Sequence, residues 1–247
     1  MLQTDDILGI IPARMASTRF PGKPLVFIQD IPMVIRVYQE ASRVLQNLVI
    51  ASGDQEIGTI AQRYGAEFIL TRGDHISGTS RCIEAMKAYS DKTGRTFGAI
   101  LNIQGDEPML TPAAIALLAN DISRPENGIS TLIRPETDLL AFRNPNRVKV
   151  VLNREGFALY FSRSPIPFYR TEGTSWFSHV GMYAFKKEIL EEIGRLLEPG
   201  KLETAESLEQ LRWLENGYPI HCCETDYAGF GVDTPEDLEA LLKSGLI

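Results

Sequence analysis

The first half of the chain alternates short apolar runs with amphipathic segments, and this alternation restricts the fold more than any other feature. Residues 7–11 predict a buried strand, and residues 32–46 carry apolar side chains at helical spacing. The alternation continues with expected strands at 48–51, 67–70 and 99–103 and expected helices at 55–64, 80–90 and 112–122. Repeated β-α units of this length predict an α/β fold with a mostly parallel, doubly wound sheet.

The second half has a different rhythm. Strands are expected at 148–152, 158–161, 179–185 and 218–223, with a hairpin turn at 153–156. Helices are expected at 187–197, 204–215 and 235–243, the last capped by Thr234 and ended by Gly245. We therefore expect a single domain, 1–247, in which a smaller mixed α+β lobe accompanies the parallel sheet.

Composition narrows the classes of partner. The net charge of −7 and the pI of about 5.1 argue against a nucleic-acid-binding surface. No apolar run approaches the ~20 residues of a membrane span, and Asp5 and Asp6 stand where a signal peptide needs basic residues. The three cysteines include no C-x-x-C pair, so we expect reduced thiols in the cytoplasm.

A basic loop follows the first predicted strand and stands out against this acidic background. It contains Arg14, Arg19 and Lys23, with small and hydroxyl-bearing residues between them. Such a loop can bind a polyanion such as a nucleoside triphosphate, although a solvated basic loop is the alternative. It is not a Walker A loop, because Pro24 follows the Gly-Lys pair.

Two aspartates are candidates for a magnesium site. Asp106 follows the expected strand at 99–103 beside a glycine, and Asp233 precedes the closing helix. Magnesium takes oxygen ligands and often only one or two carboxylates together with substrate phosphates. The alternatives are a turn-forming aspartate at 106 and an ordinary helix start at 233.

A loop rich in glycine, serine and threonine, residues 72–81, leads into the helix expected at 80–90. Thr79 is the expected cap of that helix, and Thr111 is the expected cap of the helix at 112–122. Free backbone N–H groups at such a helix start can bind an anion or the edge of a base. His75 in this loop is expected to be structural.

Segments spread in order along the chain resemble the family of sugar-activating cytidylyltransferases, and most closely the 3-deoxy-manno-octulosonate (Kdo) cytidylyltransferases. The resemblance is carried by IIPARMASTRFPGKPL at 10–25, DHISGTSR at 74–81, QGDEP at 104–108, ALYFSRSPIP at 158–167 with HVGMYAF and ESLEQLR after it, and GVDTPEDL at 231–238. Ser80 stands where the family usually has an acidic residue, and Gly53 stands in a segment where the family usually reads A-T-D-D.

The resemblance implies a nucleotide-diphospho-sugar transferase fold and a set of site residues. The implied catalytic residues are Arg14, Arg19, Lys23, Asp106 and Asp233, and the two aspartates would hold Mg²⁺. The implied nucleotide-binding residues are Pro12, Ala13, Arg14, Lys23, Arg72, Ser77, Gly78, Arg81 and Gly105. The implied sugar-binding residues are Arg19, Gln104, Arg163, His179, Tyr183, Glu206 and Gln210. Residues 1–125 would mainly bind CTP, and 126–247 would mainly bind the sugar and form a homodimer.

Spacing adds two expectations about the sugar-binding residues. Alternation along the strand at 179–185 places His179 and Tyr183 on one face. Glu206 and Gln210 are four residues apart, so one helix at 204–215 would place them on one face, although a solvated helix with paired charges is the alternative.

The reaction implied by the resemblance joins CTP and Kdo to give CMP-Kdo and pyrophosphate, for lipopolysaccharide synthesis. The anomeric hydroxyl would attack the α-phosphorus in line, without a covalent enzyme intermediate. Two alternatives stay open. One is a related synthetase for a sialic-type or amino-substituted acid, and the other is a catalytically silent nucleotide-binding regulator.

Overall fold

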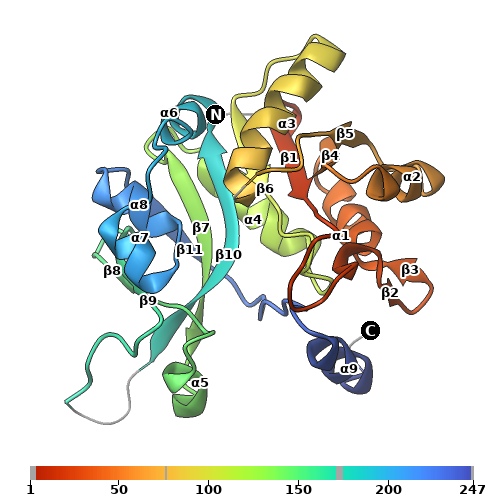
Figure 1. Cartoon of the computed structure of the whole chain (residues 1–247). Helices are drawn as coiled ribbons and strands as arrows, with labels where there is room; N and C mark the ends of the chain where they lie inside the picture. The colour runs from red at the N-terminus through yellow and green to blue at the C-terminus, as the bar shows by residue number, and fades with distance from the viewer. Residues whose placement is uncertain (1–3, 76, 171–174, 246–247) are drawn as a thin grey trace. The chain divides into compact units, whose positions relative to one another are not determined.

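The structure is a computed structural model that describes residues 4–75, 77–170 and 175–245 (Figure 1). Its internal contacts divide the chain into two units. The mixed-sheet unit consists of Leu117–Ala228, and the parallel-sheet unit consists of the described residues before Leu117 together with those from Gly229 onward. None of the helices in these described ranges has the length and apolar content needed to cross a bilayer.

In the parallel-sheet unit, strands β6, β1, β4 and β5 pair in that order and all run parallel. Their bounds are β1 (Ile7–Pro12), β4 (Asn47–Ser52), β5 (Phe68–Leu70) and β6 (Ala99–Asn102). The helices that pack against them are α1 (Met33–Ser42), α2 (Gln55–Arg63) and α3 (Gly78–Thr93). Ile7, Leu8, Ile10 and Ile11 are each at most 1% exposed, because a parallel strand is covered on both faces. The predicted β-α alternation is confirmed.

The end of the chain belongs to this same unit. A short hairpin, β2 (Phe27–Ile28) and β3 (Ile31–Pro32), adjoins the helix α9 (Pro235–Lys243) in Figure 1. Ile28, Met33, Val232 and Leu241 form a buried cluster that joins the two segments. The predicted bounds of α9 and its cap are confirmed, since the Thr234 side chain accepts a hydrogen bond from the Asp237 backbone N–H.

The mixed-sheet unit contains both parallel and antiparallel pairs, as expected for a mixed lobe. β11 runs parallel to β7, whereas β10 runs antiparallel to β7 and β8, and β8 runs antiparallel to β9. The strand bounds are β7 (Ile129–Glu136), β8 (Lys149–Leu152), β9 (Ala158–Ser162), β10 (Trp176–Lys186) and β11 (Ile220–Glu224). The helices are α5 (Leu139–Arg143), α6 (Lys187–Ile193), α7 (Lys201–Glu206) and α8 (Gln210–Glu215).

The unit boundary falls within α4 (Pro112–Ile122), whose predicted bounds and Thr111 cap are confirmed. Two expectations are wrong, and one strand is missing from the prediction. The cap of α3 is Ser77 and not Thr79, because Ser77 and Ser80 form a reciprocal capping box that begins two residues earlier. The missing strand is β7. The single helix expected at 204–215 is two helices, α7 and α8, separated at Ser207, which has a left-handed φ of +51°.

Candidate functional site

A pocket of about 280 Å³ lies in the parallel-sheet unit, beyond the carboxyl ends of β1 and β6. This is where parallel α/β sheets bind their ligands. Its lining residues are Pro12, Ala13, Arg14, Ser17, Arg19, Lys23, Pro24, Met33, His75, Ser77, Gly78, Arg81, Gln104, Gly105, Asp106 and Asp233. The structure therefore brings together all the residues expected to be catalytic, and most of those expected to bind the nucleotide. Arg14 and Asp106, which follow β1 and β6, both line this pocket.

A lysine bridges the two candidate metal ligands. The Lys23 Nζ lies 2.6 Å from Asp106 Oδ2 and 3.0 Å from Asp233 Oδ1, and Arg19 Nη2 lies 3.1 Å from Asp233 Oδ2. The Lys23 side chain is only 13% exposed, whereas those of Asp106 and Asp233 are 31% and 43% exposed. The two carboxylates thus already share one cation at the base of an open pocket.

The charges of this bridge reinforce one another. Burial opposes the charged form of Lys23, but Asp106 and Asp233 outweigh it and raise the pKa of Lys23. Burial likewise opposes ionisation of Asp233, but the Lys23 ammonium and the Arg19 guanidinium lower its pKa. Lys23 and Asp233 therefore stay ionised at neutral pH.

The basic loop owes its shape to local hydrogen bonds. The Met15 N–H donates to Asp54 Oδ2 at 2.8 Å, and the Gly22 N–H donates to the Met15 carbonyl at 3.0 Å. Gly22 has a φ of +75°, which a side chain would strain, and the short 3₁₀ turn Lys23–Leu25 begins directly after it. These contacts aim Lys23 into the pocket.

The loop after β6 and the last segment of the chain are fastened to each other. The Val232 N–H donates to the Asp106 carbonyl at 2.9 Å, and the Phe230 N–H donates to Glu107 Oε2 at 2.8 Å. Glu107 thus positions the backbone that carries Asp233, a role that the sequence analysis did not assign. Its place between Asp106 and Pro108 in the QGDEP motif was the available clue.

The start of α3 forms another wall of the pocket. Arg81 is 4% exposed, and its Nη1 donates to the Thr71 hydroxyl at 2.5 Å and to the Arg72 carbonyl at 3.1 Å. Burial lowers the pKa of Arg81 from its ordinary value. Arg81 therefore presents one face to the pocket while the loop before α3 holds its guanidinium.

Arg72 is the expected nucleotide-binding residue that does not line the pocket. Its Nε lies 3.3 Å from Glu84 Oε2, and its backbone N–H donates to the same carboxylate. His75 lines the pocket, with its ring nitrogens 3.1 Å from Ser80 Oγ and 2.5 Å from Glu84 Oε2. Arg72, His75 and Ser80 thus form one network around Glu84.

Both departures from the family motifs lie at defined places in the structure. Ser80 closes the capping box of α3 with Ser77, a role that an acidic residue can also fill, as Asp237 does in α9. A Cβ at Gly53 would lie 2.7 Å from the Gly73 Cα, so these two loops approach too closely for a side chain.

Two of the residues expected to bind the sugar, Arg19 and Gln104, line the pocket, and the other five belong to the mixed-sheet unit. Arg163 donates from Nε to the Glu206 carbonyl at 2.6 Å, from Nη1 to Pro145 and from Nη2 to Ser207. Glu206 accepts from the Ser162 hydroxyl at 2.6 Å and from the Arg163 N–H at 2.9 Å.

The helical argument for Glu206 and Gln210 is wrong. Glu206 ends α7 and Gln210 begins α8, so the two residues do not share one helix face. The Arg163 contacts with Glu206 and Ser207 surround the break between the helices.

His179 and Tyr183 do lie together, with ring centroids 5.3 Å apart. Strict alternation along β10 fails, because the register shifts between Val180 and Tyr183 and both Met182 and Tyr183 are buried. The Thr131 hydroxyl fits this bulge and lies 3.0 Å from His179 Nε2. Burial lowers the pKa of His179 to about 3, so the ring is neutral at physiological pH.

Two buried polar atoms nearby are unsatisfied. The Tyr183 hydroxyl and Gln210 Nε2 have no hydrogen-bond partner among the residues that the structure describes. Unpaired buried polar atoms are costly, and each one in a folded protein needs an explanation.

Comparison with known proteins agrees with this geometry. A family model described as "Cytidylyltransferase" matches residues 8–224. A 3-deoxy-manno-octulosonate cytidylyltransferase of Parabacteroides distasonis is 43% identical, over 95% of this chain and 96% of its own length. The Solibacter usitatus protein of the same name is 45% identical, over 96% of this chain and 93% of its own length. A solved CMP:2-keto-3-deoxy-manno-octonic acid synthetase complexed with CTP is similar with a TM-score of 0.88 and 38% identity, covering 96% of this chain and 97% of the other.

Proposed function

We propose that this chain, which belongs to the 3-deoxy-manno-octulosonate cytidylyltransferase family, transfers CMP from CTP to Kdo and releases pyrophosphate. The observation that carries the proposal is the Lys23 bridge between Asp106 and Asp233, set in a pocket with Arg14 and Arg19. The relatives named above act on this sugar acid by name, so the comparisons favour it over a sialic-type acid. The pocket also argues against a catalytically silent nucleotide-binding regulator, because all the residues that the resemblance implies to be catalytic line it.

The pocket supplies the charge that a triphosphate needs. Arg14, Arg19 and Lys23 would bind phosphate oxygens, and their charge would stabilise the leaving pyrophosphate. The α3 start at Ser77 and Gly78 would offer backbone donors to the nucleotide. Fixed cations and donors of this kind accelerate the transfer by positioning and by charge neutralisation.

The carboxylate pair fits Mg²⁺. Asp106 and Asp233 present oxygen ligands on either side of one point, and that point is already cationic because the Lys23 ammonium lies there. Bound Mg²⁺ would neutralise phosphate charge and lower the pKa of the attacking hydroxyl. Lys23 would then leave the two carboxylates and donate to the triphosphate instead.

The polar groups of the mixed-sheet unit suit the sugar acid. Neutral His179, with the unsatisfied atoms of Tyr183 and Gln210, can exchange hydrogen bonds with sugar hydroxyls. Glu206 and Arg163 are held to each other and would frame this region. A site built from hydrogen-bonding groups discriminates strongly against ligands that lack a partner.

We also propose a homodimer in the cytoplasm, with no membrane or nucleic-acid partner. Large apolar side chains of the mixed-sheet unit are exposed, with Leu140 at 80%, Leu159 at 62% and Phe168 at 87%. Such side chains are typical of an interface. The three cysteines are free thiols, which supports a reducing compartment.

The test is pyrophosphate release from CTP, with Kdo and a sialic acid compared and with Mg²⁺ present or removed by chelation. We expect release with Kdo and Mg²⁺ only, and no release from Asp106→Asn. Release with sialic acid but not Kdo would overturn the substrate assignment. Full activity after chelation would overturn the metal assignment.

A further inference from the structure

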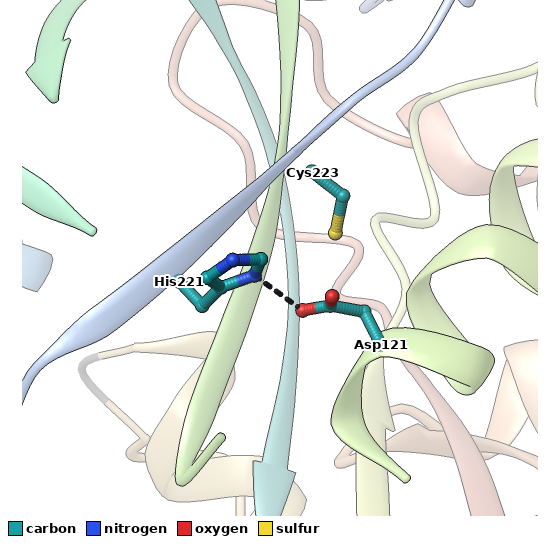
Figure 2. Close-up of side chains that lie close together, drawn as sticks. All are labelled: Asp121, His221 and Cys223. Carbon is teal, nitrogen blue, oxygen red and sulfur yellow. Dashed lines mark hydrogen bonds and ion pairs between the residues drawn. The ribbon is translucent and has the colours of Figure 1, made fainter. Parts of the chain in front are cut away.

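A second cluster of metal-ligand residues lies in the mixed-sheet unit. Asp121, His221 and Cys223 offer one carboxylate oxygen, one ring nitrogen and one sulfur, all within 4.8 Å of one another (Figure 2). His221 and Cys223 are two residues apart on β11 and therefore project from the same face of the strand. Asp121 comes from the last turn of α4. The three side chains converge on one point in Figure 2.

Neighbouring donors fix the carboxylate. Asp121 is 4% exposed, and its Oδ2 accepts from Asn127 Nδ2 at 2.9 Å and from the Ser130 hydroxyl at 2.7 Å. The same oxygen lies 2.8 Å from His221 Nδ1. Hydrogen bonds of this kind orient the ligands of protein metal sites. The Phe157 ring packs edge-on against the His221 ring, with centroids 5.1 Å apart, and fixes its plane.

The donor set selects the class of metal. Sulfur, imidazole nitrogen and carboxylate together suit Zn²⁺ and its analogue Co²⁺, whereas Mg²⁺ takes oxygen ligands only. None of the three residues is among those lining the pocket described above. A metal here would therefore be separate in chemistry from the magnesium proposed at Asp106 and Asp233.

We propose that Asp121, His221 and Cys223 bind one zinc-class divalent cation, with water as the fourth ligand. On binding, Cys223 loses its thiol proton to solvent and its sulfur binds the metal. His221 Nδ1 also binds, and the imidazole carries its one proton on Nε2 instead. One Asp121 oxygen exchanges its contact with His221 Nδ1 for the metal and keeps its hydrogen bonds from Asn127 and Ser130. The ion would join α4 to β11 and stabilise this unit.

The test is titration of the chelator-treated full-length protein with Co²⁺ and then Zn²⁺. We expect one equivalent of Co²⁺ to give a thiolate-to-cobalt charge-transfer band in the near ultraviolet, and one equivalent of Zn²⁺ to abolish it. Cys223→Ser should lose the band and weaken Zn²⁺ binding at least tenfold, since loss of a hydrogen-bond partner of a metal ligand alone costs about 10–100-fold. Cys222→Ser is the matched control, since it alters the adjacent buried thiol and should retain the band.

Controls for folding separate the loss of a metal ligand from the loss of the native structure. Thermal unfolding of each variant without metal shows whether it folds, and His221→Gln gives a second variant that keeps the thiol. Absence of a charge-transfer band in the folded wild-type protein would overturn the proposal and leave a hydrogen-bonded cluster. A band that persists in Cys223→Ser, or disappears in Cys222→Ser alone, would also overturn it.

Discussion

The molecule contains two carboxylate clusters that are built in opposite ways. Asp106 and Asp233 lie in an open pocket, and cations, Lys23 and Arg19, neutralise them. Asp121 is 4% exposed, and its Oδ2 contacts an amide, a hydroxyl and a histidine, while the Arg124 guanidinium lies 3.8 Å from its Oδ1 on a side chain that is itself 60% exposed. A long cationic side chain can move to another anion, whereas short neutral donors on neighbouring elements cannot. The first cluster is therefore suited to exchange of partners, and the second to fixing structure.

The largest expected effect concerns the first cluster, Asp106 and Asp233. Asp106→Asn and Asp233→Asn should each abolish turnover while the fold survives, because each removes an anionic oxygen ligand from a partly exposed site. Pyrophosphate release measures turnover, and circular dichroism measures folding. Near-normal activity of either variant at physiological Mg²⁺ would contradict the assignment of Asp106 and Asp233 to metal binding, and with it the difference between the two clusters.

Removal of the bridging cation should have two opposite effects. Lys23→Ala should slow catalysis by about 10²-fold or more, since a fixed charge-stabilising donor is lost. It should also let Mn²⁺ bind without CTP more tightly than in the wild-type protein, because Lys23 no longer occupies the space between the carboxylates. Electron paramagnetic resonance of free Mn²⁺ measures the second effect. Arg19→Ala should act in the same directions more weakly, and a change in Kdo affinity alone would contradict the assignment.

A substitution in the second cluster, around Asp121, should change the stability of the protein and not its turnover. Asp121→Asn should cost about 3 kcal/mol, because the amide cannot accept from all the donors and leaves buried groups unpaired. Urea unfolding measures this loss, and kcat of the folded variant should stay close to that of the wild-type protein. A variant with unchanged stability and reduced kcat would reverse the roles that we give to the two clusters.

The smallest effects concern the polar groups assigned to the sugar. His179→Ala and Gln210→Ala should each raise KM for Kdo about tenfold, the equivalent of one neutral hydrogen bond, and leave CTP affinity unchanged. Steady-state kinetics with Kdo and calorimetric titration with CTP separate the two substrates. Loss of CTP affinity with unchanged Kdo kinetics would mean that the nucleotide and sugar assignments are reversed.

The sequence predicted best where local chemistry decides the structure. The bounds of α4 and α9 follow from a threonine cap followed by proline, and both are as expected. The break at Ser207 has no such cue, because a serine with positive φ replaces the usual glycine or proline. The cap of α3 was misplaced because three hydroxyl residues at 77, 79 and 80 compete for it.

The two clusters also differ in how far the sequence could predict them. The motifs in the sequence predict Asp106, Asp233 and the residues around them as a site. The contact of Lys23 with Asp233 spans 210 positions, so no local pattern predicts it. Asp121 and His221 are 100 positions apart, and β7, which supplies Ser130, was not expected, so nothing indicated this cluster.

Asp233 reaches its partners from the last segment of the chain, which pairs with the loop after β6. During synthesis on the ribosome, Lys23 and Asp106 are made long before the second carboxylate. A nascent chain that stops short of residue 233 can form β1, β4, β5 and β6 and still present a lysine bound to only one aspartate. Completion of the site therefore requires synthesis to pass residue 233, and products truncated before that residue should be inert.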